Sequence, residues 1–277
     1  MWIKPQPMLK EIANTIYQAS ELEAENYRQS PAGKKLDLKV IIICITTAIS
    51  LTLIKYFSNY NILIDSVDFF NHEIALRLHE LFFNGPDAQF MRLTNWAVIT
   101  IVGYFLLPLI AVKLIFKESL QNYGLTFKNA IKDYRIYLIM IAFMIPLVLA
   151  ISFNPSFQAK YPFYQIAPNQ PLTPQFFLWE IEYLIQFFAV EFFFRGFLLH
   201  GLKHRFGYYA VFIMTIPYCM IHFGKPMAET LAAIVAGVVL GTLSLKSKNI
   251  YLGFLIHISV AITMDVCALW QKGVLHF

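Results

Sequence analysis

The chain has 277 residues, of which 58% are hydrophobic and only 14% are charged. Because soluble domains carry about 25% charged residues, this composition excludes an ordinary soluble globular protein and favours an integral membrane protein. The net charge of +5 comes from Lys and Arg in short loops between apolar runs, which is a topology signal and not a nucleic-acid-binding patch.

Residues 1–37 are predicted to form a polar cytoplasmic tail that contains one helix, over residues 8–27. Residues 38–277 are predicted to form one helical transmembrane domain. We expect about seven spans of roughly 20 apolar residues each, which makes the fold class all-α and polytopic. The predicted spans cover residues 40–56, 96–116, 136–153, 175–199, 208–223, 229–245 and 250–270.

The connections between the spans carry further signals. Residues 57–95 contain a candidate surface helix over residues 69–83, and residues 154–174 contain five prolines, which predicts an extended loop. Lys and Arg gather before the first span and after the second, fourth and sixth, so the amino terminus is predicted to be cytoplasmic. In the sixth span, Gly237 and Gly241 predict close helix packing.

The most informative stretch covers residues 187–200, with the sequence FFAVEFFFRGFLLH. Glu191 and Arg195 are four residues apart, so on a helix they share one face. A charge within a membrane span costs roughly 2.5 to 3.5 kcal/mol and is usually retained for a reason. Two interpretations stay open at this point: a structural ion pair that holds helices together, or part of an active site.

Three further polar residues, His222, His257 and Asp265, lie in later predicted spans. Ionisable residues inside a membrane face the bundle interior, so we expect these groups to face one another. A desolvated carboxylate can take a proton from water, and a neutral imidazole can orient that water. A second imidazole can donate to the oxyanion of a tetrahedral intermediate. The set is therefore typical of water activation, with Arg195 orienting Glu191.

Two other chemistries are compatible with buried charges. One Glu and two His form a known catalytic zinc set, but the sequence lacks the H-E-x-x-H spacing and any C-x-x-C pair. Zinc is therefore the alternative to a reaction without a cofactor. A small transporter would use the charges as a binding site, but it is expected to show inverted repeats, and none is visible.

The ordered set of motifs resembles the CPBP family of intramembrane proteases, which includes the CAAX prenyl endopeptidases and bacteriocin-processing and self-immunity proteins. The family pattern is E-E-x-x-x-R, then F-x-x-x-H, then H-x-x-x-N, each on its own span. The resemblance covers about residues 176–270, the protease-like core of the domain. The residues of this chain at the matching positions are Glu191, Arg195, Tyr218, His222 and His257.

The resemblance implies an intramembrane endopeptidase that cleaves membrane-anchored peptides or proteins entering from the lipid bilayer. It implies neither a metal nor a nucleic-acid partner, and it implies the plasma membrane of a bacterium. The chain departs from the family pattern at two positions: Val190 stands where the family has its first Glu, usually given as the base, and Ala261 stands where the third motif ends in a polar residue.

These departures leave two hypotheses. Either the chain is an inactive relative that acts as an immunity or scaffold protein, or Glu191 is the base of an active enzyme, which we favour. Asp265 or Glu229 could supply the missing polar group. Simple counting also puts Glu191 and His222 at different depths of the bilayer, so the catalytic hypothesis requires tilted or broken helices.

Overall fold

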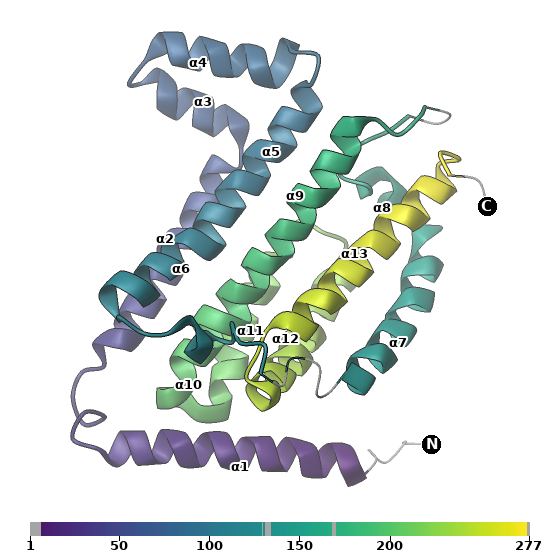
Figure 1. Cartoon of the computed structure of the whole chain (residues 1–277). Helices are drawn as coiled ribbons and strands as arrows, with labels where there is room; N and C mark the ends of the chain where they lie inside the picture. Colours follow the sequence, from purple (N-terminus) through teal and green to yellow (C-terminus); the bar gives the residue numbers. More distant parts are fainter. Residues whose placement is uncertain (1–6, 129, 131–133, 168–169, 276–277) are drawn as a thin grey trace. The chain divides into compact units, whose positions relative to one another are not determined.

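The computed structural model of the protein describes residues 7–128, 130, 134–167 and 170–275. Within these ranges every regular element is a helix (Figure 1). The contacts divide the chain into two compact units. Unit 1 comprises residues 1–47, 108–133 and 191–253, and unit 2 comprises residues 48–107, 134–190 and 254–277. Residues 1–6 of the predicted tail and residues 168–169 of the predicted proline-rich loop lie outside the described residues.

Five helical segments among the described residues are long and apolar enough to cross a membrane, judged by length and composition. This finding confirms an all-α polytopic membrane protein. The segments match five predicted spans, although the second begins eight residues before the predicted residue 96, at Ala88. They are α2 (Leu38–Phe57), the continuous helix from α5 to η3 (Ala88–Ile115), α7 (Tyr134–Ser152), α12 (Met227–Ser247) and α13 (Tyr251–Gln271).

The other two predicted spans have a different character. The helix α9 (Pro174–Glu191) carries three glutamates, Glu180, Glu182 and Glu191, and continues into the π-helix η5 (Phe192–His200). The helix α11 (Ala210–Met220) has only 11 residues, whereas a span needs about 20 residues to cross a hydrocarbon core of about 30 Å. The count of seven spans therefore stays a prediction.

The two long connections contain short helices with polar caps. In residues 57–95, α3 (Tyr60–Asp68) and α4 (His72–His79) begin after Asn59 and Asn71, whose side chains accept from backbone N–H groups. The prediction of an extended loop over residues 154–174 is wrong for α8 (Pro155–Lys160). Proline at the first helical position is compatible with a helix, because its missing N–H would have had no partner there.

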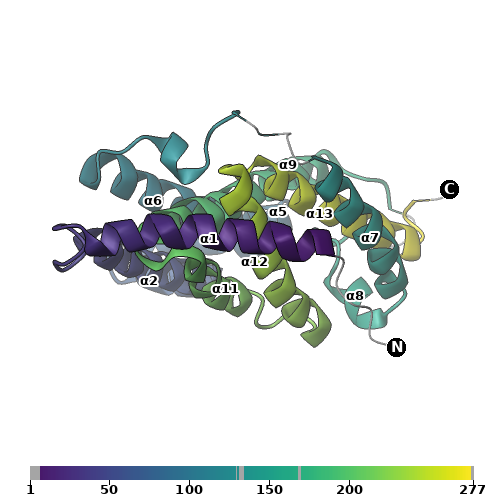
Figure 2. The same ribbon diagram turned by 90° about the horizontal axis from the view of Figure 1, so that it is seen from below.

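In unit 1, the first helix packs against the segment that follows η5. The helix α1 (Pro7–Gln29) lies against α10 (Gly201–Phe206; Figure 1) and also contacts α12, across which it runs in the view of Figure 2. Glu21 Oε1 accepts from the backbone N–H of Tyr208 at 3.0 Å, and Arg28 Nη1 donates to the carbonyl of Arg205 at 3.2 Å. These polar contacts hold α1 against the basic segment after η5.

The close packing predicted for Gly237 and Gly241 is confirmed. A Cβ added at Gly237 would lie 2.9 Å from the Thr215 side chain, and one at Gly241 would lie 2.9 Å from Met214, so α12 approaches α11 closely at both glycines. The Thr230 hydroxyl of α12 donates to the carbonyl of His222 at 3.0 Å. The glycines and this bond fix the end of α11 and the turn after it, which carries His222.

In unit 2, an aromatic core surrounds the middle of α9. Trp179 is fully buried. Its ring centroid lies 5.4 Å from that of Tyr183 and 5.7 Å from that of Trp96, and both of these rings stack on Trp179. Ala97 of α5 and Ala261 of α13 belong to the same core. Ala261 is thus a buried packing residue, four positions after His257.

Candidate active site

The two charges of the first motif form a direct ion pair, as predicted. Arg195 Nη1 lies 2.9 Å from Glu191 Oε1, and both side chains have an exposed fraction of 0%. Breaking a buried pair by removing one partner is strongly destabilising, because it leaves an uncompensated charge. Each of the two residues therefore depends on the other for its burial.

The ion pair lies where α9 changes into the π-helix η5, and all nine residues of η5 are buried. π-helical turns are rare and frequently occur at functional sites. The sequence predicted an ordinary α-helix through this stretch, because a continuous apolar run fits both hydrogen-bonding patterns. Arg195 therefore lies on a widened helical segment that the sequence did not reveal.

Tyr218 forms the second support of Arg195. The Arg195 guanidinium carbon lies 4.1 Å from the centroid of the Tyr218 ring, and Tyr218 is only 2% exposed. A guanidinium over an aromatic face is stabilised by a cation–π interaction, most strongly when both groups are away from water. Tyr218 stands at the matching position of the second motif, but the sequence alone indicates no role for it. Its signal was an aromatic residue one helical turn before a membrane histidine.

His222 lies two residues beyond the end of α11, and Tyr218 also orients it. Its Nδ1 lies 2.8 Å from the carbonyl of Tyr218, and since a carbonyl only accepts, this nitrogen carries the hydrogen. A neutral imidazole then has its lone pair on Nε2. The two rings meet edge-on, with centroids 5.0 Å apart.

Glu191, Arg195, Tyr218 and His222 thus form one continuous set of contacts in unit 1. The helix α11 is only 11 residues long. It ends at Met220 and packs against η5, so Tyr218 of α11 reaches Arg195.

Gly253, near the start of α13, makes room for the carboxylate. A Cβ at this position would lie 2.6 Å from Glu191 Oε2, which is closer than real Cβ contacts come. Only glycine therefore fits without a shift of Glu191. Gly253 was not among the predicted site residues. The feature of the sequence that could have indicated it is a glycine inside a predicted span, four positions before His257.

His257 and Asp265 belong to unit 2. The His257 ring lies 5.4 Å from the ring of Phe187 and is tilted by 30° from it. Asp265 is 3% exposed, and its carboxyl adjoins that of Glu180. Glu180 was not among the predicted site residues. Since Glu191 and His222 belong to unit 1, the convergence of His257 and Asp265 on them stays a prediction.

Two further possibilities concern Glu229 as a polar group of the site and a metal ion held by His, Cys, Asp or Glu. The helix re-forms after Pro226, which is the condition under which Glu229 could supply the missing polar group. However, Glu229 Oε1 lies 2.5 Å from Lys225 Nζ in an ion pair. Among the described residues, no three His, Cys, Asp or Glu side chains form a group that could hold a metal ion.

Comparison with known proteins adds a family. Residues 172–263 match the family described as type II CAAX prenyl endopeptidase, Rce1-like. The match supports CPBP family membership. At the level of the family, the match supports a CAAX-type intramembrane protease. It contains Glu191, Arg195, His222 and His257 and ends before Asp265. No curated protein and no solved structure matches the chain.

Proposed function

We propose that this CPBP-type protein is an intramembrane endopeptidase in which Glu191 activates a water molecule without a metal. Its substrate is a membrane-anchored peptide or protein that enters from the lipid bilayer. The observation that supports the proposal is the fully buried Glu191 carboxylate, held by Arg195 at 2.9 Å. Arg195 in turn lies over Tyr218, and Tyr218 contacts His222.

The contacts suggest a division of roles. Arg195 holds the carboxylate of Glu191 through Oε1, and Glu191 is the residue assigned to take the proton from water. The lone pair on His222 Nε2 would accept a hydrogen bond from the same water and orient it. The water oxygen then bonds to the scissile carbonyl carbon, and His257 donates to the oxyanion. When the C–N bond breaks, the proton held by Glu191 passes to the leaving nitrogen.

The second candidate function is that of an inactive family member serving as an immunity or scaffold protein. Three observations favour it: Val190 replaces the usual carboxylate, Ala261 replaces the usual polar residue, and Glu191 has no exposed surface. In this case the ion pair only stabilises the fold. The two functions differ in one respect, which is whether water reaches Glu191 and reacts.

A cleavage assay on the purified full-length protein in lipid nanodiscs tests the proposal, with a set of membrane-anchored peptides as substrates. We expect His222→Ala to lower turnover by about 10²- to 10⁴-fold and His257→Ala by about 10²- to 10³-fold. The exposed His79 on α4 provides the control, and His79→Ala should keep full turnover. No cleavage of any peptide by folded wild-type protein would favour the inactive family member.

A chelator separates the two enzyme mechanisms. The proposal predicts unchanged turnover after treatment with a chelator, because no step requires a metal. Loss of turnover that zinc restores would overturn it in favour of a metalloprotease with the same Glu and His residues as ligands.

A further inference from the structure

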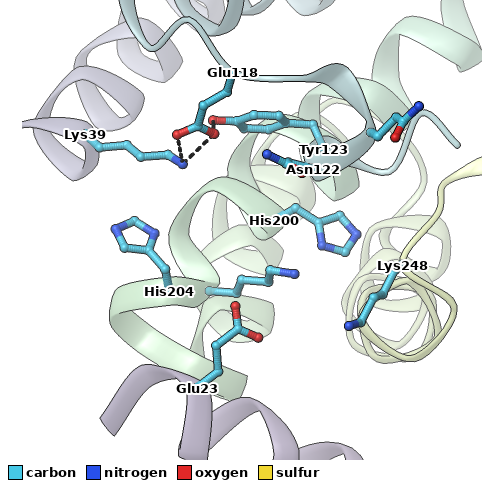
Figure 3. A pocket seen from close by; sticks show the side chains of 10 residues that line it. Glu23, Lys39, Glu118, Asn122, Tyr123, His200, His204 and Lys248 are labelled. Carbon is cyan, nitrogen blue, oxygen red and sulfur yellow. Dashed lines mark hydrogen bonds and ion pairs between the residues drawn. The ribbon is translucent and has the colours of Figure 1, made fainter. Parts of the chain in front are cut away.

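Unit 1 contains a polar pocket that the protease chemistry does not use. Its volume is about 390 Å³, and neither Glu191, Arg195 nor His222 lines it (Figure 3). Its walls come from α1, the beginning of α2, the segment before and within η4 (Leu120–Tyr123), the end of η5, α10, and the end of α12. The positions of the loop charges predict that this side of the protein faces the cytoplasm.

One wall of the pocket is electrically balanced. Lys39 Nζ lies 2.8 Å and 2.9 Å from the two carboxylate oxygens of Glu118, as the dashed lines in Figure 3 mark. The Tyr123 hydroxyl donates to Glu118 Oε2 at 2.9 Å. His204 is engaged as well, with its ring nitrogens 2.8 Å from the carbonyl of Gly201 and 3.0 Å from Asp37 Oδ2. These groups form a fixed, hydrogen-bonded frame.

The opposite side carries Lys203 and Lys248 together with Glu23 of α1. None of the ion pairs among the described residues of unit 1 involves either lysine. Burial lowers the pKa of Lys203, Glu23 opposes this as the next largest cause, and the charges of Lys248 and Lys39 lower it further. Lysines outnumber carboxylates in the lining of the pocket by three to two, so an added anion between Lys203 and Lys248 would relieve their mutual repulsion.

The backbone of Lys248 supports a role for its side chain. Lys248 closes α12 in the left-handed conformation, with φ 57° and ψ 29°, and its N–H donates to the carbonyl of Ser244. Glycine or asparagine is usual at this position of a helix end. A residue held in a sparsely populated backbone region is a reason to look for a function. Here the conformation belongs to a lysine that lines the pocket.

We propose that this pocket binds a phosphate-bearing group between Lys203 and Lys248, supplied either by the headgroup of an anionic phospholipid or by inorganic phosphate. Each ammonium offers three donors, and a phosphate offers several acceptor oxygens. The pocket lies at the ends of α2 and α12, two candidate membrane spans. Basic pockets between spans at the cytoplasmic surface are suited to lipid headgroups. This binding function goes beyond peptide cleavage and does not depend on it.

The test measures binding to the full-length protein in nanodiscs. One arm titrates inorganic phosphate into phosphatidylcholine nanodiscs, and the other compares them with nanodiscs that contain phosphatidic acid, with bound lipid counted by native mass spectrometry. We expect at least one of the two ligands to bind wild-type protein, and the arm that responds identifies the source. Lys203→Gln and Lys248→Gln should each weaken that binding on the order of ten-fold, as loss of a charge-assisted hydrogen bond does.

The matched control removes the same charge outside the pocket. Lys34 and Lys35 are exposed lysines of unit 1 that do not line the pocket, so the single variants Lys34→Gln and Lys35→Gln should each leave binding unchanged. Equal losses in the control and in the pocket variants would mean diffuse attraction to a basic surface and would overturn the proposal. Failure of wild-type protein to bind either ligand would overturn it too. Lys203 and Lys248 are both at least partly exposed. Each single variant is measured separately, so the test does not rely on a double variant folding.

Discussion

The backbone of Gly253 stands directly against the Glu191 carboxylate: a Cβ at Gly253 would lie 2.6 Å from Oε2. Gly253→Ala should therefore push the carboxylate away and strain its 2.9 Å contact with Arg195. Overpacking a filled site costs typically about 1–3 kcal/mol. We expect a lower midpoint of thermal unfolding in nanodiscs and, for an active enzyme, slower cleavage.

Gly85→Ala is the control for this substitution. Gly85 has an ordinary φ of −66°, and its added Cβ would meet its nearest neighbour at 3.4 Å, a normal contact. The midpoint of thermal unfolding of Gly85→Ala should stay close to that of wild-type protein. Equal midpoints for the two variants would show that Gly253 is not a tight approach to Glu191.

Arg195→Ala tests the buried ion pair. The substitution removes the cation that lies 2.9 Å from the Glu191 carboxylate, where both side chains are 0% exposed, and breaking a buried pair in this way should cost about 3–5 kcal/mol of unfolding free energy. The loss is expected to exceed that of a typical exposed arginine, such as Arg77→Ala on α4. Reversible unfolding in mixed micelles measures both.

A double variant then separates stability from chemistry. Replacing a buried pair with apolar residues of similar size is often neutral or stabilising. Glu191→Leu with Arg195→Met should therefore recover most of the stability lost in Arg195→Ala while remaining inactive. A double variant that stays as unstable as Arg195→Ala would mean that Arg195 stabilises the fold mainly through Tyr218 and not through Glu191.

The residues that the sequence identified correctly are those whose chemistry conflicts with their surroundings. A Glu and an Arg in an apolar run can hardly be anything but paired, and the four-residue spacing gave the contact between Glu191 and Arg195. The long apolar helices and the glycine packing of α12 followed from length and composition in the same way.

The features that the sequence did not reveal depend on tertiary contacts. The π-helical turn at residues 192–200 is a choice between two hydrogen-bonding patterns of the same apolar residues. The role of Tyr218 depends on α11 packing against η5, and the role of Gly253 depends on the approach of another segment to Glu191. No periodicity within one helix encodes these contacts. The short helix after Asn154 escaped prediction for a local reason, because proline-rich composition hid a capped helix start.

Asp37, which lies outside the predicted spans, should make the stability of the protein depend on pH. Burial raises the pKa of Asp37, but hydrogen bonds from the Tyr27 hydroxyl, His204 and the Val40 N–H together bring it below its ordinary value of 3.8. A depressed pKa in the folded state contributes stability that is present above the unfolded value and is lost as the pH falls through the folded value. The contribution should be constant above about pH 5 and disappear below 3.8.

Asp37→Asn provides the comparison. At neutral pH we expect its midpoint to be lower, by an amount corresponding to about 1 kcal/mol, because charge-assisted hydrogen bonds are lost. The difference from wild-type protein should shrink as the pH is lowered through the acid range. A difference that stays constant from neutral pH to below 3.8 would contradict the assignment of these bonds to the ionised Asp37.

The most direct measurement of the central claim compares cleavage of a membrane-anchored peptide by wild-type protein, Glu191→Gln and Glu182→Gln. Glutamine keeps the shape of Glu191 but cannot take a proton, so turnover should fall by about 10²- to 10⁴-fold while the protein remains folded in the nanodisc. Glu182 lies on the same helix and accepts a hydrogen bond from Thr94 at 2.9 Å, so Glu182→Gln should retain most of the turnover. Full turnover in Glu191→Gln would contradict the account, because the proposed base would then not be needed for the reaction.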